Sequence, residues 1–120
     1  MGTSFHVDMP EAAREKIASR FRALGEPMRL RMIQRLFRGP ASVGEILETV
    51  GGTQANVSKH LALLYKEKLV DRRKEGTFTV YSIADPTLLK ICSIVCDEVE
   101  RETRASAEAI LGTGRRSGGR

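Results

Sequence analysis

The stretch TQANVSKHLALLYKEKLV, residues 53–70, begins with polar residues, becomes amphipathic and ends on two apolar residues. Its residues Val57, Leu61 and Leu64 recur at steps of four and three, which predicts one buried face of a helix. The rest of the helix carries more hydrogen-bonding side chains than solubility requires. Such a set is typical of a helix that reads the edges of nucleic-acid bases, the alternative being a merely solvated face. Its members are Gln54, Asn56, Ser58, Lys59 and His60.

A shorter helix is predicted just before this one. Ser42 and Glu45 have the spacing of a capping box, which indicates a helix that starts there and runs through Val50. The glycine pair at 51–52 then forms a tight turn, and Thr53 caps the second helix. Two short helices joined by a glycine turn are the signature of a helix-turn-helix.

A β-hairpin is expected after the second helix. The apolar pairs at 69–70 and 80–81 suit strands, and Glu75-Gly76 is a turn signal between them. The tip of this hairpin is predicted to carry three cations, which would lie over a DNA backbone or minor groove. The alternative is a charged strand edge that only keeps the protein soluble. The three cations are Arg72, Arg73 and Lys74.

Three further helices are predicted around this unit. The segments 11–24 and 28–37 repeat apolar residues at helical spacing, and Gly25 separates them. The last helix is expected from near Pro86 to about Leu111. The fold class is therefore mainly α with a small β-hairpin, a winged helix-turn-helix in the order α-α-α-α-β-β-α.

The chain of 120 residues is expected to hold one DNA-binding and dimerisation domain, residues 10–111. A flexible arm at 1–9 precedes it, and a disordered basic tail at 112–120 follows it. The first and last helices carry more apolar surface than so small a core needs, which predicts a homodimer through these two helices. The net charge of +5 favours an anionic partner, although the tail supplies +3 of it.

The composition predicts a cytoplasmic protein. No apolar run reaches the roughly 18 residues of a membrane helix, and the N-terminus has no apolar segment typical of a secretory signal. Two cysteines four residues apart do not form a disulfide framework, which favours a reducing compartment. No grouping of histidine, serine or paired carboxylates suggests catalysis, so the chain is not expected to be an enzyme.

Several segments resemble one family. LGEPMRLRMIQRLF, residues 24–37, is similar to the second helix of ArsR/SmtB-type bacterial repressors, and residues 53–70 with the following 71–83 resemble their recognition helix and wing. The resemblance covers roughly residues 12–100 and is most specific in Ser-Lys-His-Leu and the hairpin after it. It implies a homodimeric winged-helix transcriptional regulator, a repressor whose DNA affinity changes with a ligand or redox event.

In such a protein the start of the recognition helix reads the major groove. Gln54 and Asn56 can pair bidentately with adenine, and Lys59 with guanine. A dimer would present two such helices about one DNA turn, roughly 34 Å, apart on an inverted-repeat operator. An inducer that tilts the two protomers would spoil this spacing and lower affinity. The predicted DNA-binding residues are Thr53, Gln54, Asn56, Ser58, Lys59, His60, Arg72, Arg73 and Lys74.

The resemblance also implies which inducer sites are missing. Many relatives bind soft metals through a C-x-C pair at the start of the third helix, where this chain has Ser42 and Gly44. Others bind zinc between the last helices through aspartate and histidine, and here only Asp85 matches. The later ligand positions hold Thr87, Glu98 and Arg101.

Cys92 and Cys96 remain as the candidate sensor. Their i,i+4 spacing puts both thiols on one face of the last helix, so a dimer could gather four thiols. Thiolates bind soft metal ions, and thiols can also be oxidised or persulfidated. The alternative is that two small apolar side chains pack in the dimer interface. No cofactor is expected for folding, and a soft metal ion at this pair is the candidate ligand.

Three hypotheses follow for the function. The leading one is a DNA-binding repressor that senses through Cys92 and Cys96 or through no site visible in the sequence. A second is a repressor controlled by a partner protein or an apolar ligand at the dimer interface. A third is a winged-helix protein-interaction module without DNA binding, which the base-reading side chains argue against because such a module does not need them.

Overall fold

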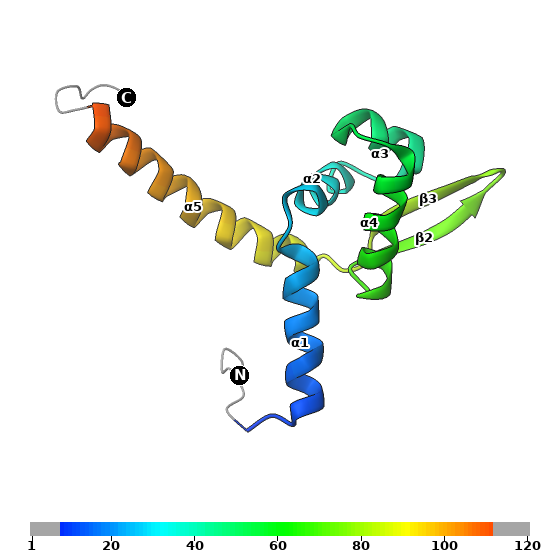
Figure 1. Ribbon diagram of the computed structural model, residues 1–120, viewed down its shortest axis with the longest axis horizontal. Coiled ribbons are helices and arrows are strands. Elements are labelled where there is room, and N and C mark those ends of the chain that lie inside the picture. The colour runs from blue at the N-terminus through cyan, green and yellow to red at the C-terminus, as the bar shows by residue number, and fades with distance from the viewer. Residues whose placement is uncertain (1–7, 112–120) are drawn as a thin grey trace. The chain divides into compact units, whose positions relative to one another are not determined.

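A computed structural model describes residues 8–111, and the predictions made for residues 1–7 and 112–120 lie outside this range. The chain divides into two compact units between Asp85 and Pro86. The second unit holds one long helix, α5 (Thr87–Leu111), and the first holds the remaining elements (Figure 1). These are α1 (Glu11–Leu24), α2 (Pro27–Leu36), β1 (Ala41–Ser42), α3 (Val43–Val50), α4 (Gln54–Lys66), β2 (Val70–Glu75) and β3 (Phe78–Ile83).

Local capping signals separate the first two helices as predicted. Gly25 ends α1, and its N–H donates to the carbonyl of Arg22 over 3.1 Å. The carboxylate of Glu26 then accepts the backbone N–H of Arg29 at 2.9 Å, which caps the start of α2. Pro27 occupies the first position of α2, where a missing N–H costs nothing.

The predicted helix-turn-helix is confirmed. The Ser42 hydroxyl accepts the N–H of Glu45 at 3.2 Å, and the Glu45 carboxylate accepts the N–H of Ser42 at 2.9 Å, which completes the capping box. Both glycines of the turn at 51–52 adopt positive φ, 79° and 88°, a conformation that other residues avoid. The Thr53 hydroxyl accepts the N–H of Asn56 at 3.1 Å and starts α4.

The sheet has three strands rather than the two of the predicted hairpin. The short strand β1 pairs antiparallel with β3, Ala41 with Tyr81 and Ser42 with Val80, so the strand order is β1-β3-β2. This strand is not among the predicted elements because two residues show no periodicity. Its second residue is also the helix cap, so the sequence pattern there indicates only a helix start.

The core of the first unit lies among α2, α3, α4 and the sheet. Three core residues, Val57, Leu61 and Leu64, are the predicted inward stripe of α4, and each is fully buried. Burial of each such side chain stabilises the fold by about 1.5–3 kcal/mol. The largest fully buried side chains are Met32, Ile33, Ile46, Val57, Leu61, Leu64 and Val70.

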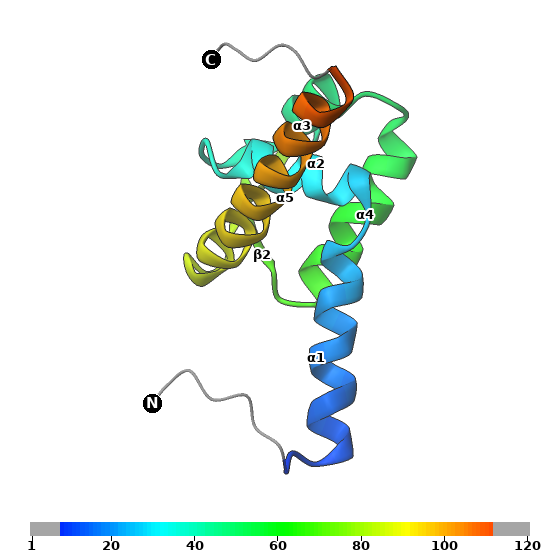
Figure 2. The ribbon, with the colours of Figure 1, turned by 90° about the vertical axis from the view of Figure 1, so that its left-hand side faces the viewer.

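Helix α1 and the hairpin both extend beyond this core, in different directions (Figure 1). Figures 1 and 2 show that α1 meets α4 at one end and continues past it, and Figure 1 shows that β2 and β3 project beyond the helices. A hydrogen bond of 2.5 Å from the Ser19 hydroxyl to the Glu67 carboxylate joins α1 to the end of α4. Much of the apolar face predicted for α1 is not covered, since Ile17 is 37% and Phe21 is 59% exposed.

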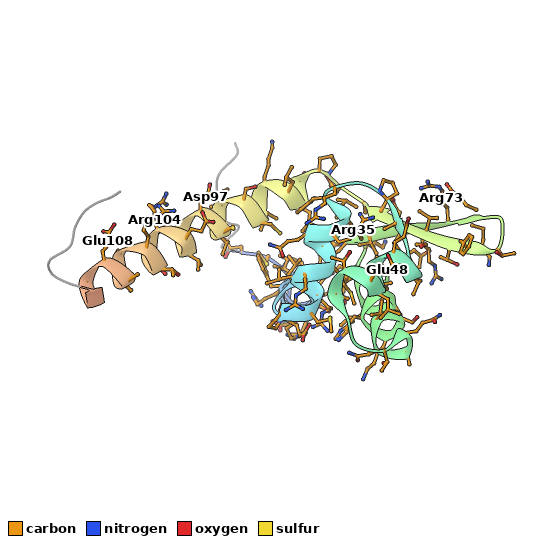
Figure 3. The ribbon with its side chains drawn as sticks, turned by 90° about the horizontal axis from the view of Figure 1, so that it is seen from above. Arg35, Glu48, Arg73, Asp97, Arg104 and Glu108 are labelled. Atoms are coloured by element: carbon orange, nitrogen blue, oxygen red, sulfur yellow. The ribbon has the colours of Figure 1, made fainter. Side chains whose placement is uncertain are left out.

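Helix α5, taken by itself, carries an apolar stripe over its first half. Ile94, Val95 and Val99 form part of an apolar stripe and are at least half exposed. Charged side chains, among them Asp97 and Arg104, follow one side of the helix (Figure 3). No helix between residues 8 and 111 is both long and apolar enough to cross a lipid bilayer.

Candidate nucleic-acid interface

The start of α4 presents a row of polar side chains to solvent. Because Val57 and Leu61 are buried, the rotation of the helix about its axis places the polar positions outward. The predicted contact residues Gln54, Asn56, Ser58 and Lys59 are all exposed, on one and a half turns of helix. Thr53 is exposed too, with its hydroxyl engaged as the helix cap. This surface offers donors and acceptors of the kind that pair with base edges.

His60 lies apart from this row. Its side chain is partly buried, and its Nδ1 atom lies 3.1 Å from a guanidinium nitrogen of Arg29 at the start of α2. His60 is predicted to contact DNA, and the structure shows that its ring also contacts Arg29 of the same chain, which the sequence does not predict.

The hairpin cations lie along strand β2, so their predicted place at the tip is wrong. The turn lies at Gly76, with φ of 63°, as predicted, but the register pairs Arg72 with Tyr81 and Lys74 with Thr79, so the cations precede the turn on the strand. Strand β2 continues up to Glu75, and the turn signal in the sequence does not show where the strand before it ends. The cations therefore line the length of the projecting strand.

Arg72 is held between α4 and the sheet. Its guanidinium lies 4.0 Å from the centre of the Tyr65 ring, a cation–π contact. A hydrogen bond to Tyr81 is the main cause that raises the pKa of Arg72 above its ordinary value. The side chain thus joins the last turn of the recognition helix to strand β3.

Arg73 and Lys74 follow Arg72 on the same strand, and all three residues are exposed. Arg73 stands on the projecting hairpin (Figure 3), where its Nε donates to the Glu75 carboxylate at 2.7 Å. Both side chains are exposed. A hollow of about 380 Å³ lies between the hairpin and α4, and its cationic lining suits a phosphate group. The hollow is lined by Tyr65, Arg72, Arg73, Lys74, Thr79 and Tyr81.

The thiol pair lies on α5. Cys92 is partly buried and Cys96 is exposed, and both are free. Burial, with a smaller effect of the neighbouring Cys96, raises the pKa of the Cys92 thiol, which lowers its thiolate fraction at neutral pH. Among the described residues, no group of three or more His, Cys, Asp or Glu side chains could hold a metal ion.

Two residues that contact predicted site residues, Arg29 and Tyr65, were not themselves predicted. Arg29 contacts His60 across elements that are 31 residues apart in sequence, and Tyr65 stacks on Arg72. Neither contact leaves a local sequence pattern. The only sequence signal for the Tyr65–Arg72 contact is that an aromatic residue on the exposed side of a helix is followed by a strand rich in cations.

The stacked arginine generates a stability prediction. Replacing Arg72 with lysine keeps the charge but loses the planar group that stacks on Tyr65. We expect the backbone amides of β2 and β3 to exchange hydrogen faster in Arg72→Lys, as measured by hydrogen–deuterium exchange. The control is Arg73→Lys, one residue along the same strand, which should leave these rates unchanged. Equal rates in wild type and Arg72→Lys would contradict this role for Arg72.

Comparison with known proteins identifies the family. A family model described as a helix-turn-helix domain matches residues 24–73. An uncharacterised HTH-type transcriptional regulator of Methanocaldococcus jannaschii is 37% identical over 82 residues, 68% of this chain and 92% of that protein. The probable mercury resistance operon repressor of Streptomyces lividans is 34% identical over 85 residues, 71% of this chain and 68% of that protein.

A solved structure agrees with these relatives. The solution structure of a homodimeric winged helix-turn-helix domain from Mycobacterium bovis, titled a possible ArsR-family regulator, has a TM-score of 0.70 and 26% identity. The match covers 81% of this chain and 95% of that chain. Proteins of this kind bind double-stranded DNA and are not enzymes, as the sequence predicts. The chain belongs to the ArsR/SmtB-type family of winged helix-turn-helix transcriptional regulators.

Proposed function

We propose that this protein is a repressor that binds an inverted-repeat operator as a homodimer and leaves it when an inducer binds. Residues 10–111 would act as one DNA-binding and dimerisation domain in the cytoplasm. The observation that carries the proposal is the exposed polar row at the start of α4, set opposite a fully buried apolar stripe. A helix with this arrangement can enter a major groove while its other face stays in the core.

The DNA contacts divide into base reading and backbone binding. Gln54 and Asn56 have the amide groups that pair with adenine, and Lys59 has the ammonium group that pairs with guanine. Ser58 is placed for a base or a phosphate, and Thr53 starts the helix whose N–H groups favour an anion. On the hairpin, Arg73 and Lys74 would contact the phosphate backbone, with Arg72 behind them at the hollow.

The exposed apolar faces support the homodimer. Helix α1 exposes Ile17 and Phe21, and α5 exposes Ile94, Val95 and Val99. Exposed apolar side chains at helical spacing mark a protein–protein interface, and a second copy of the chain offers the same faces in return. The Mycobacterium bovis relative is described as homodimeric. A dimer would place its two α4 helices about one DNA turn, roughly 34 Å, apart.

Cys92 and Cys96 are the proposed inducer site. They lie on the helix that carries the exposed apolar stripe, so a dimer would bring two such pairs toward one another. Soft metal ions and oxidants both react with thiolates. The raised pKa of Cys92 argues that its reaction is slow until a metal ion binds the sulfur and displaces the proton.

The base-reading role generates a prediction for Lys59. We expect Lys59→Met to weaken binding about tenfold or more and to relax a preference for guanine in each half-site, because one direct base contact is lost. Fluorescence anisotropy at fixed salt, with DNA from upstream of the protein's own gene, measures both effects.

The control is Lys66→Met, at the other end of the same helix, which removes an equal charge. It should weaken binding less than about threefold, as a distant charge does in salt. Equal losses in both variants would show that only charge matters. No binding by wild type would favour the protein-interaction alternative.

The thiol proposal has its own test. The double variant Cys92→Ser and Cys96→Ser should bind the operator as tightly as wild type, because neither residue lies on the proposed DNA surface. Adding a soft metal ion or a mild oxidant should release wild-type protein from DNA but not the variant. If wild type and variant respond alike, the thiols are packing residues, and a partner protein or apolar ligand at the dimer interface becomes the better explanation.

A further inference from the structure

The side chain of Arg29 connects α1, α2 and α4. Its Nε donates to the carbonyl of Ala23 at 2.6 Å, and its Nη2 donates to the carbonyl of Arg22 at 3.2 Å. These carbonyls belong to the last turn of α1, where helical carbonyls have no partner within their own helix. Arg29 therefore caps the C-terminus of α1 from the first turn of α2.

The third branch of the guanidinium contacts the recognition helix. Nη1 of Arg29 lies 3.1 Å from Nδ1 of His60. A guanidinium can only donate, so Nδ1 must be the acceptor and the ring proton must lie on Nε2. The contact fixes both the tautomer and the orientation of the histidine ring.

Arg29 is itself held at both ends. Its backbone N–H donates to the Glu26 carboxylate at 2.9 Å, and its side chain is partly buried with three acceptors. Hydrogen bonds from a charged donor are stronger than those between neutral groups. A side chain with all these partners occupies one position, so it can serve as a rigid connection between helices.

This connection supplies what the apolar core cannot. Burial of Val57 and Leu61 decides which side of α4 faces inward, but the hydrophobic effect has no directional preference and tolerates small rotations. A hydrogen bond depends steeply on its angle. His60 follows Lys59 directly and lies one turn after Asn56, so a fixed ring orientation constrains the part of the helix that would read bases.

We propose that Arg29 and His60 are positioning residues for DNA binding, which hold the recognition helix in a fixed orientation relative to the end of α1. The role rests on the proposed contact of α4 with DNA. His60 would act through its Nδ1 acceptor and not as a reader of bases. Base-reading side chains need placement to within about 0.5 Å, which only a supported helix provides.

Two substitutions of His60 separate these roles. Asparagine places an amide oxygen near the position of Nδ1, whereas glutamine extends its amide to the position of Nε2. We expect His60→Asn to bind operator DNA within about threefold of wild type, and His60→Gln to bind about tenfold more weakly, the effect of one lost hydrogen bond to a charged group. The opposite order would show that His60 contacts DNA through Nε2 and would overturn the proposal, as would wild-type affinity in both variants.

The arginine provides an independent measurement. Arg29→Lys keeps the charge but cannot reach three acceptors with one ammonium group. We expect about tenfold weaker binding with an unchanged slope of affinity against salt, because no phosphate contact is lost. Nitrogen-15 NMR of the His60 ring should show the Nε2-protonated tautomer in wild type and a mixture in Arg29→Lys. An unchanged tautomer would contradict the contact, whatever the fold stability of the variant.

The same titration should include Lys59→Met. If Lys59→Met, His60→Gln and Arg29→Lys all bind like wild type, the proposed contact between α4 and DNA is wrong. If Lys59→Met binds weakly while His60→Gln and Arg29→Lys bind like wild type, only the positioning role fails.

Discussion

Burial of one apolar stripe, Val57, Leu61 and Leu64, is the constraint on which the other features of this protein depend. These three residues fix which side of α4 faces the core, and hence which side faces solvent. Both neighbours of the helix are placed by the same packing, since α3 reaches it through the glycine turn and β2 follows it directly. The polar row, the hollow beside the hairpin and the His60 contact are all consequences of this one orientation.

Directional contacts then refine an orientation that packing sets only coarsely. Arg29 joins the end of α1 to α4, and Arg72 joins the end of α4 to the hairpin. Two arginines thus use their planar, multiply donating groups for contacts between elements, Arg29 while partly buried and Arg72 while exposed. Cations that a sequence shows only as positive charge therefore have different roles, and three-dimensional contacts decide which.

The helices could be predicted from sequence because their signals are local. Proline and glycine at the ends of α1, the capping box at Ser42 and the glycine pair before α4 all act within a few residues, and the structure confirms each boundary closely. Strand β1, the Arg29–His60 contact and the Tyr65–Arg72 stack join residues remote in sequence. No local pattern encodes such contacts, so the exposed polar row of α4 could be predicted from the sequence while the contacts around it could not.

The proposed DNA-binding surface and the proposed thiol sensor differ in how much of each a single chain supplies. Within the first unit, helix, hairpin and supporting contacts are complete in one chain. By contrast, the two thiols of α5 form no metal site among the described residues, and the raised pKa of Cys92 disfavours its reactive form. We therefore propose that sensing at these thiols involves a second copy, for which the exposed apolar faces of α1 and α5 offer a surface.

Hydroxyl-radical footprinting of the DNA upstream of the protein's own gene tests the central claim most directly. Two recognition helices in one dimer should protect two segments whose centres lie about one helical turn, roughly 34 Å, apart and whose sequences form an inverted repeat. One protected segment, or protection without any symmetry, would contradict the account of a dimer that reads its operator with paired α4 helices.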